Sequence, residues 1–332
     1  MTPYREILKR SWNISWKNKS LWFFGFFASI ISFGAELKIF SKAFSQESGL
    51  KTINDIGLFI KTGIFSREAL QNISHLMRTE TSTMLLLSLY LLVILAMTIF
   101  FIWLATSSQI SIIDAVKKIK KDEQQKISIK EQIKKSKSKF WPVLGMNALI
   151  WLIINGITLL ISLLLVVILI QNKTYLTLLY GLLFIIFIPI ILFISFVIKY
   201  AIAYIVIDDK KVSSALKNGW IMFKKNWLIS IEMAITLFFI NILAMLVVSF
   251  ASFLIFILFS GIAVTTAIFV FSSQAFFWTL IAIAIIIALV IIALSGAIVN
   301  TFQISAWTEL FIKLKENKAS SKLERIFTEQ NK

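Results

Sequence analysis

Long uninterrupted apolar runs constrain this sequence more than any other feature. Blocks such as Phe140–Ile170, Leu176–Ile198 and Trp227–Ser260 exceed the roughly 18 apolar residues that mark a membrane-spanning helix. Across the chain, 58% of the residues are hydrophobic and 15% are charged, whereas soluble domains are about half apolar and about a quarter charged. The sequence therefore predicts an all-α fold, a polytopic membrane helical bundle that forms a single integral membrane domain over residues 1–332.

We expect about six transmembrane helices, accompanied by interfacial amphipathic helices. The spans cover approximately residues 20–36, 83–106, 140–170, 175–200, 227–259 and 275–305. Several exceed what a hydrocarbon core of about 30 Å requires at about 1.5 Å per residue, so these helices either tilt or project from the bilayer. The segment Gly261–Gln274 is either an outer loop or a re-entrant or interfacial link, and the sequence leaves this open.

The start of the chain allows two interpretations. Its basic residues and the apolar stretch that follows fit a cleaved signal peptide. However, about 20 residues containing Trp12 and Trp16 precede the apolar part, which is long and aromatic for such a leader. We therefore favour a retained first helix.

The distribution of lysine and arginine predicts the orientation of the chain. The net charge of +17 would suggest nucleic acid binding in a soluble protein. Here 27 of the 34 Lys and Arg residues lie in segments 1–20, 106–139, 199–226 and 306–332, on one side of the predicted spans. The positive-inside rule places both termini and both lysine-rich loops in the cytoplasm. This predicts a multi-pass protein of the inner (cytoplasmic) membrane and no nucleic acid partner, and the abundance of Lys and Ile suggests a prokaryotic source.

A lysine cluster followed by a tryptophan occurs just before three of the predicted spans. Lysines near lipid head groups and an indole ring at the boundary suit a helix that enters the bilayer from the cytoplasm. Upstream of the first and third of these spans, further aromatic residues indicate helices in the membrane plane. The interfacial anchors predicted in this way are Trp12, Trp16, Trp22, Trp141, Trp220 and Trp227. Because alternate spans carry the same entrance, the sequence suggests a threefold repeat of an interfacial helix, a span inward and a span outward.

The cytoplasmic segment Asp114–Lys139 contains ten lysines. Lysines close to anionic lipid contribute about 1 kcal/mol each to membrane attraction, but topology alone also accounts for a basic loop, and both interpretations can hold. Membrane lipids, with anionic head groups on the cytoplasmic side, are therefore the expected partners. The sequence indicates no particular protein partner.

Two ionisable residues lie within predicted spans, Lys199 and Glu232. Both fall near the cytoplasmic ends of their spans, at similar depth, and a charge inside a bilayer is costly unless it is paired or hydrated. We predict an intramembrane ion pair between them. Such a pair would lock two helices together, or would handle a proton or a substrate; snorkelling of each side chain to the interface is a further possibility.

Amide side chains form a second group of polar residues within the predicted spans. They are Asn147, Asn155, Asn241, Asn300 and Gln303. In lipid such groups either bond between helices or line a hydrated cavity. Bonding between helices is the favoured interpretation.

Patterns typical of enzymes are missing. The sequence has no cysteine, a single histidine (His75), no GxSxG and no P-loop. Asp208, Asp209 and Glu232 are the nearest approach to a catalytic acidic cluster. We therefore expect no enzymatic activity, no metal and no cofactor.

The stretch Lys199–Trp227 resembles a family pattern. It comprises a basic residue, an acidic residue after an apolar stretch, an "Ala-Leu-Lys-x-Gly-Trp" helix and a basic cluster before a tryptophan, at Lys199, Asp208, Ala215, Leu216, Lys217, Gly219, Trp220, Lys225 and Trp227. The pattern is similar to that of poorly characterised six-span prokaryotic integral membrane proteins related to the membrane domain of some glycerophosphodiester phosphodiesterases. The resemblance implies an all-helical six-span fold. It implies no activity, because this chain lacks the soluble phosphodiesterase domain, and it lacks the proline that relatives carry between the basic and acidic positions.

Together these features favour a non-enzymatic integral membrane protein that acts in membrane organisation, lipid interaction or partner scaffolding. The alternative is a transporter or permease-like protein for a lipid or small solute. A continuous polar cavity joining Asn155, Lys199, Glu232 and Asn300 would distinguish the transporter from a scaffold with a dry, side-chain-filled interior.

Overall fold

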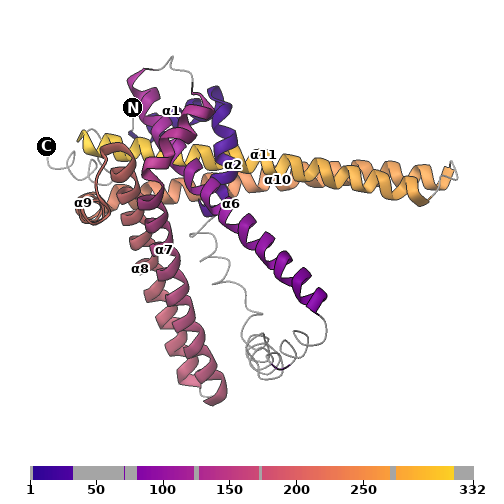
Figure 1. The fold of residues 1–332 in the computed structure, drawn as a ribbon, viewed down its shortest axis with the longest axis horizontal. Coiled ribbons are helices and arrows are strands. Elements are labelled where there is room, and N and C mark those ends of the chain that lie inside the picture. Colours follow the sequence, from indigo (N-terminus) through magenta and orange to yellow (C-terminus); the bar gives the residue numbers. More distant parts are fainter. Residues whose placement is uncertain are drawn as a thin grey trace, which may run out of the picture. The chain divides into compact units, whose positions relative to one another are not determined.

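The computed structural model describes residues 3–32, 71, 81–122, 127–171, 174–269 and 274–317. Over these ranges the protein forms eight helices and no strand (Figure 1). They are α1 (Pro3–Lys17), α2 (Ser20–Ser32), α6 (Thr81–Lys121), α7 (Ile129–Gln171), α8 (Thr174–Asp208), α9 (Val212–Lys225), α10 (Trp227–Phe269) and α11 (Gln274–Lys315). The predicted all-α fold is confirmed.

Five of these helices are long and apolar enough to cross a membrane. The candidate spans are Leu85–Lys121, Ile129–Ile161, Ile185–Asp208, Trp227–Thr266 and Phe276–Lys315. By contrast, the 13 residues of α2 extend about 20 Å, less than a hydrocarbon core of about 30 Å. The protein is therefore a multi-pass membrane protein with five such helices in its described part. The sixth span stays a prediction because its expected range runs beyond the described residues.

Several helices are longer than predicted, mostly at their basic ends. α6 continues to Lys121 and α11 to Lys315, and α7 already begins at Ile129. Lys, Glu and Gln are good helix formers, so a change from apolar to charged residues ends the membrane-compatible stretch without ending the helix. α10 likewise continues through Gly261 to Phe269, so this part of the supposed link is regular helix.

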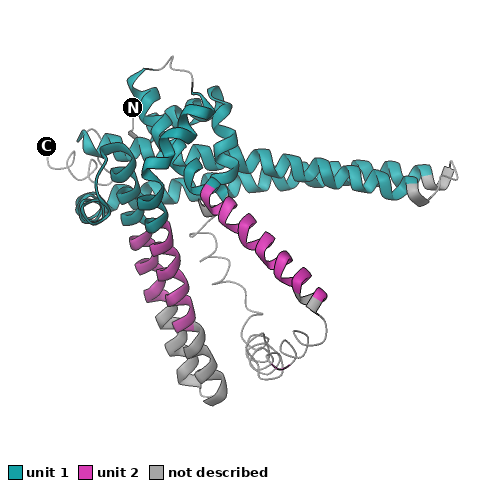
Figure 2. Ribbon diagram, viewed as in Figure 1, with its two compact units in different colours: residues 1–32, 104–146, 196–332 teal, residues 33–103, 147–195 magenta. Residues whose placement is uncertain are grey.

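The chain divides into two compact units (Figure 2). Unit 1 comprises residues 1–32, 104–146 and 196–332, and unit 2 comprises residues 33–103 and 147–195. Unit 2 contains the first part of α6, the second part of α7 and most of α8. The expectation of a single domain stays a prediction.

The core of unit 1 forms around the end of α6. Leu104, Ala105 and the residues from Ile110 to Ile119 are largely buried. Ile112, Ala115, Val116 and Ile119 pack in one cluster with residues of α1 and α2 (Ile14, Leu21, Phe24 and Ala28). α11 packs against α1, α2 and α10. The ends of α1, α6 and α11 are thereby brought together around one apolar core.

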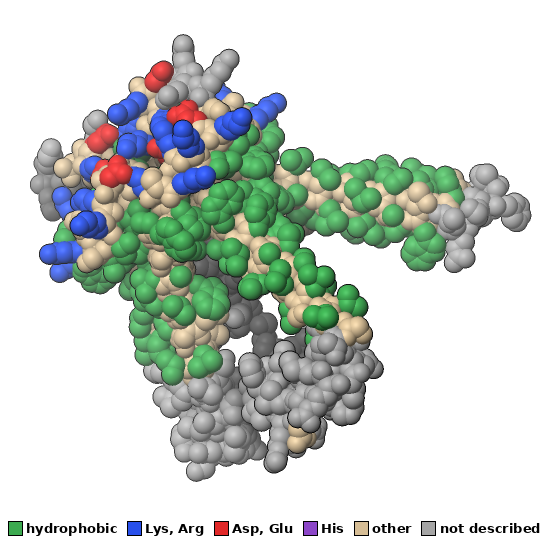
Figure 3. Space-filling model, viewed as in Figure 1, with side chains coloured by type: hydrophobic (Ala, Val, Ile, Leu, Met, Phe, Trp, Pro, Cys, Tyr) green, Lys and Arg blue, Asp and Glu red, His purple; other side chains and the backbone are tan. Residues whose placement is uncertain are grey.

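The surface of unit 1 separates charge from apolar residues. Figure 3 shows the Lys and Arg side chains gathered at one end of unit 1, whereas the extended part of the α10–α11 hairpin is apolar. Outward-facing side chains of that hairpin include Phe239, Leu246 and Leu289, all exposed. A large exposed apolar surface of this kind suits contact with lipid.

Two of the three expected repeat entrances share one local structure. α1 ends at Lys17 and α9 at Lys225, and in each case the helix that follows begins within three residues. At both breaks an asparagine amide bonds to the carbonyl four residues earlier: Asn18 Nδ2 to Ile14 O at 3.0 Å and Asn226 Nδ2 to Met222 O at 2.9 Å.

The third expected entrance, near Trp141, is different. α7 runs without a break from Ile129 through Pro142. No asparagine precedes this tryptophan, and the Ser138 hydroxyl donates to the Lys135 carbonyl within the continuing helix (3.1 Å). The expectation of a separate interfacial helix here is wrong.

Candidate functional site

The C-terminus of α8 is held by lysines from two other helices. Lys139 Nζ of α7 donates to the carbonyls of Ile205 (3.1 Å) and Val206 (3.2 Å), and Lys117 Nζ of α6 donates to Ile207 O (2.6 Å). The last carbonyls of a helix lack partners within the helix and carry a partial negative charge, so ammonium groups bind well there. Lys139 also pairs with Asp209. Through these lysine contacts, α6 and α7 both bind the C-terminal end of α8.

The backbone conformation at Asp209 allows this arrangement. Asp209 has a φ of 56°, the left-handed conformation that ends many helices and that Asp tolerates better than most residues. The Lys210 amide then donates back to Tyr204 O at 3.3 Å. This turn directs the Asp209 carboxylate toward Lys139.

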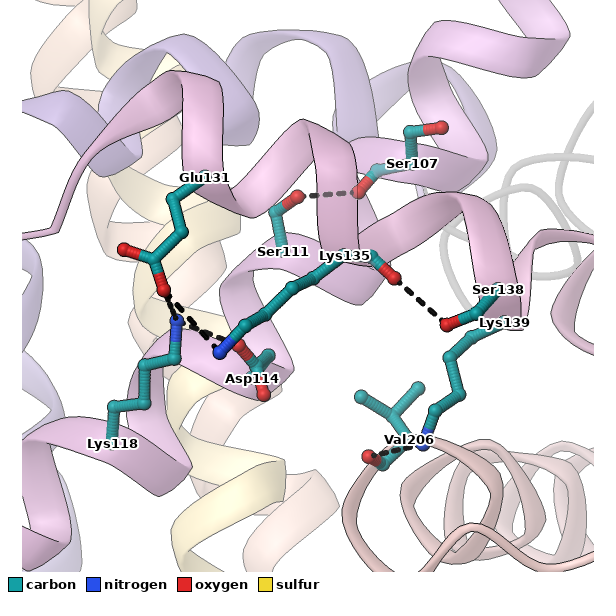
Figure 4. Close-up of polar contacts among 9 residues, drawn as sticks. All are labelled: Ser107, Ser111, Asp114, Lys118, Glu131, Lys135, Ser138, Lys139 and Val206. Carbon is teal, nitrogen blue, oxygen red and sulfur yellow. Dashed lines mark hydrogen bonds and ion pairs between the residues drawn. The ribbon is translucent and has the colours of Figure 1, made fainter.

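A second polar cluster joins α6 and α7, as Figure 4 shows. Lys118 Nζ lies 3.1 Å from both Asp114 Oδ2 and Glu131 Oε1, and Lys135 Nζ lies 3.3 Å from the same Glu131 oxygen. The buried Gln132 amide, oriented to satisfy its neighbours, donates to Asp114 (2.9 Å) and accepts from Lys118 (2.8 Å). The lysine-rich segment is therefore partly built into the fold.

Ion pairs also connect α11 to three neighbouring helices. Glu6 and Arg10 of α1 pair with Lys313 (2.8 Å) and Glu309 (3.3 Å). Lys120 of α6 pairs with Glu316 (2.6 Å), and Lys315 pairs with Asp208 of α8 (2.7 Å). The Lys313 ammonium, which donates a hydrogen bond to Glu6, holds the pKa of that carboxyl below its ordinary value of 4.5. We call these contacts, together with those of Lys117, Lys118 and Lys139, the polar belt of unit 1.

Lys139 offers a test of the polar belt. We expect Lys139→Met to destabilise the protein by about 1.5 kcal/mol, because the charged hydrogen bonds to the α8 carbonyls are lost while the aliphatic stem is kept. The readout is the apparent thermal unfolding midpoint in detergent micelles. Lys137→Met is the matched control, since Lys137 lies exposed on the same helix. Equal midpoints for the two variants would contradict the assigned role.

The predicted pair Lys199 and Glu232 lies in unit 1, on α8 and α10. Glu232 accepts a hydrogen bond from the Tyr4 hydroxyl of α1. The Lys199 ammonium lies 4.5 Å from the centre of the Trp307 ring and 5.8 Å from that of Phe196, which are cation–π distances. The ion pair between them stays a prediction, and the aromatic and phenolic contacts were not foreseen.

The amide residues of the spans lie in different surroundings. Asn300 is buried and donates across to the Gly25 carbonyl of α2 at 2.9 Å. Asn155 instead donates to Trp151 O of its own helix at 2.7 Å. Asn147, Asn241 and Gln303 are partly buried. Asn300 thus bonds between helices, whereas the Asn155 amide nitrogen bonds within one.

The expected tryptophan anchors lie mostly at the surface of unit 1. Trp141 is the most exposed, at 75%, and about half of the surface of Trp12, Trp16, Trp220 and Trp227 is exposed. Trp12 and Trp16 stack on each other with ring centres 5.4 Å apart. Trp22 is less exposed, and its Nε1 donates to Ser15 O at 2.8 Å, which fixes the corner between α1 and α2.

The three acidic residues that the sequence offered as the nearest approach to a catalytic cluster each contact another side chain of unit 1. Asp208 pairs with Lys315, Asp209 with Lys139, and Glu232 with the Tyr4 hydroxyl. No group of three or more His, Cys, Asp or Glu residues suited to a metal ion occurs among the described residues. His75 lies outside the described residues.

Sequence reasoning missed three residues of this region: Arg10, Gln132 and Glu309. Arg10 and Gln132 were treated as parts of basic segments outside the spans. Glu309 is fully buried, and its sequence signal was a single acidic residue flanked by the large apolar residues Trp307 and Phe311.

Comparison with known proteins gives one finding. Residues 21–311, most of the chain, match a protein family of unknown function (DUF7544). No curated protein and no solved structure matches. The relation to the membrane domain of glycerophosphodiester phosphodiesterases therefore stays a prediction.

Proposed function

The chain belongs to the family of unknown function DUF7544, which lends it no activity, and we propose from the structure that it is a non-enzymatic integral membrane protein of membrane organisation, lipid interaction or partner scaffolding. Its basic end would bind anionic lipid head groups in the cytoplasmic leaflet, with both termini in the cytoplasm.

The observation that carries this proposal is the joint position of exposed lysines and exposed tryptophans in unit 1. Exposed Lys17 and Lys19 flank the break after α1, and exposed Lys224 and Lys225 end α9. The exposed indole rings of Trp16 and Trp227 lie beside the same two breaks, between α1 and α2 and between α9 and α10. Ammonium groups bind lipid phosphates, and indole rings lie favourably among the head groups. The side chains at both helix breaks are therefore of the types that bind at a membrane surface.

The polar belt supports the same proposal because it neutralises acidic side chains within unit 1. Glu6, Asp208, Asp209, Glu131, Glu309 and Glu316 all pair with basic side chains inside unit 1. Exposed lysines outside the belt, such as Lys130, Lys134 and Lys137 of α7, are thus left in an electropositive surrounding. Such a field attracts anionic lipid over a distance of about 10 Å at moderate salt.

The test is the lipid dependence of stability in nanodiscs. We expect a higher thermal unfolding midpoint in discs with anionic phospholipid than in purely zwitterionic discs, and a smaller difference at high salt. The triple variant Lys130→Gln, Lys134→Gln and Lys137→Gln should reduce the difference. The matched control is Lys38→Gln, Lys42→Gln and Lys51→Gln, which removes the same charge from the segment predicted to lie on the opposite side. Equal midpoints in both lipids for the unchanged protein would refute anionic-lipid binding.

A flux assay separates this proposal from transport. Proteoliposomes of the unchanged protein, Lys199→Met and Glu232→Gln are compared with empty liposomes for solute leak and lipid scrambling. We expect no flux above empty liposomes, because the Asn300 amide is already bonded to Gly25 in a buried contact. Flux that falls in both variants would instead establish transport through the pair.

A further inference from the structure

Glu309 of α11 is a buried carboxylate to which no described residue donates a hydrogen bond. Its side chain is 0% exposed, and neither carboxylate oxygen accepts a hydrogen bond from the described residues. Within the described part of the chain it forms an ion-pair contact with Arg10 Nε of α1, 3.3 Å from Oε1. A buried charge with so few partners is costly and calls for further donors or for a proton.

Three buried hydroxyls lie on the two helices that pack together at this carboxylate. Ser305 precedes Glu309 by one turn on the same face of α11, and Ser11 and Ser15 share a face of α1, the helix that packs on α11. All three serines are fully buried, and their hydroxyls have no partner among the described residues.

Other hydroxyls nearby, one on α11 and one on α6, behave differently. Thr308 donates to Ile304 O and Ser111 to Ser107 O, both at 2.7 Å, as hydroxyls in helices commonly do. Ser11, Ser15 and Ser305 do not form this bond and remain available to another donor or acceptor.

The charges that face Glu309 come from three helices. They are Arg10 of α1, Lys120 of α6, Lys313 of α11 and Glu316, which directly follows α11. Lys313 is in contact with Glu6, and Lys120 with Glu316. Arg10 is therefore the cation that contacts Glu309 directly, and its side chain is 27% exposed, so solvent weakens its attraction.

We propose that the α1–α11 interface is a hydrated proton-binding site in which Glu309 takes up the proton. Water is the ligand that can donate to both carboxylate oxygens and also partner the serine hydroxyls. When one proton adds to the carboxylate, the side chain becomes neutral and loses its attraction to Arg10. Protonation therefore loosens α1 from α11, a property that goes beyond the proposed lipid function.

Hydrogen exchange of the full chain in nanodiscs tests the site. We compare protection factors for residues 3–17 at about pH 8 and about pH 5, corrected for the intrinsic pH dependence of exchange. We expect protection to fall about tenfold at the lower pH, equivalent to about 1.4 kcal/mol. Glu309→Gln, which resembles the protonated form, should show the lower protection at both pH values. Unchanged protection in the unaltered protein, or a pH response that survives in Glu309→Gln, would overturn the proposal.

Glu6 is a second carboxyl group in this interface whose protonation could also release α1. The two residues are distinguished by the pH at which each takes up a proton. Lys313 holds the pKa of Glu6 below 4.5, so Glu6 keeps its charge at pH 5. Its contribution to α1 docking is present above the ordinary pKa and is lost only as pH falls through the lowered folded value. Glu6→Gln should therefore retain the fall in protection between pH 8 and pH 5. Loss of that fall in Glu6→Gln would assign the effect to Glu6 and overturn the role of Glu309.

A measurement on the unaltered protein guards against a variant that fails to fold. A hydrophobic carbodiimide adds to protonated carboxyl groups in apolar surroundings, and peptide mass spectrometry locates the adduct. We expect modification at Glu309 that rises as pH falls from about 8 to about 5. Absence of modification at Glu309 across this range would refute proton uptake there.

Discussion

Replacing Gly25 with alanine is expected to destabilise the protein by about 3 kcal/mol, because the close contact between α2 and α11 leaves no room for a methyl group. A Cβ at this position would overlap Thr301 Oγ1 and the Ala297 carbonyl oxygen, and would lie 3.1 Å from the Ala297 carbonyl carbon. A backbone atom cannot rotate away, so the two helices must separate. That separation also weakens the bond from Asn300 Nδ2 to Gly25 O (2.9 Å) and the bond from Thr301 Oγ1 to Leu21 O (3.1 Å).

The readout for Gly25→Ala is the apparent thermal unfolding midpoint in detergent micelles, followed by tryptophan fluorescence. Gly261→Ala is the matched control, since Gly261 lies inside the apolar helix α10 and a Cβ there meets nothing within 4 Å. Alanine is favoured over glycine in a helix by up to about 1 kcal/mol, so this control should be neutral or slightly stabilising. A Gly25→Ala protein as stable as the Gly261→Ala protein would show that α2 and α11 do not approach this closely.

Replacing Gly219 with alanine is expected to cost about 2 kcal/mol through the contact of α9 with α8. A Cβ at Gly219 would lie 2.7 Å from the Val197 carbonyl oxygen, 3.1 Å from the Ala201 amide nitrogen and 3.3 Å from its Cβ. Two of these three atoms belong to the backbone of α8, so α9 must move outward. The tilted ring contact between Phe223 and Phe196, with centres 5.8 Å apart, would loosen with it.

Gly145→Ala serves as the control for Gly219→Ala. Gly145 is also helical and belongs to unit 1, and a Cβ there meets nothing within 4 Å. We expect increased hydrogen exchange over Val212–Lys225 in Gly219→Ala only. Unchanged exchange of α9 in that variant would refute the close α8–α9 contact, whatever its effect on overall stability.

The helical features carried by local sequence were predictable. Continuous apolar runs predicted the long helices, because only a helix satisfies its own backbone hydrogen bonds in lipid. The breaks before Trp22 and Trp227 were predictable for a similar reason, since the lysine-to-tryptophan pattern and the asparagine amide are both local. The same pattern failed at Trp141, where α7 continues without a break and the Ser138 hydroxyl bonds within that helix.

Contacts between distant residues were much less predictable. Lys139 was expected to face lipid or solvent, but its ammonium binds the end of α8. Asp208 and Asp209 looked alike in sequence, yet the left-handed turn at Asp209 sends them to different partners, Lys315 and Lys139. A lysine-rich composition gives the sign of a surface field, whereas the pairing of each lysine depends on which helix end lies within reach.

By itself, the sequence determined that this chain is all-helical, that its apolar helices suit a membrane and that its basic residues concentrate between them, because these properties depend on composition and on local periodicity. Only the tertiary structure decided that Gly25 and Gly219 are points of close helix contact, that the polar belt fastens the helix ends, and that Glu309 is buried beside Arg10. Those properties depend on distances between residues as much as 307 positions apart, the separation of Glu6 and Lys313, which no local pattern encodes.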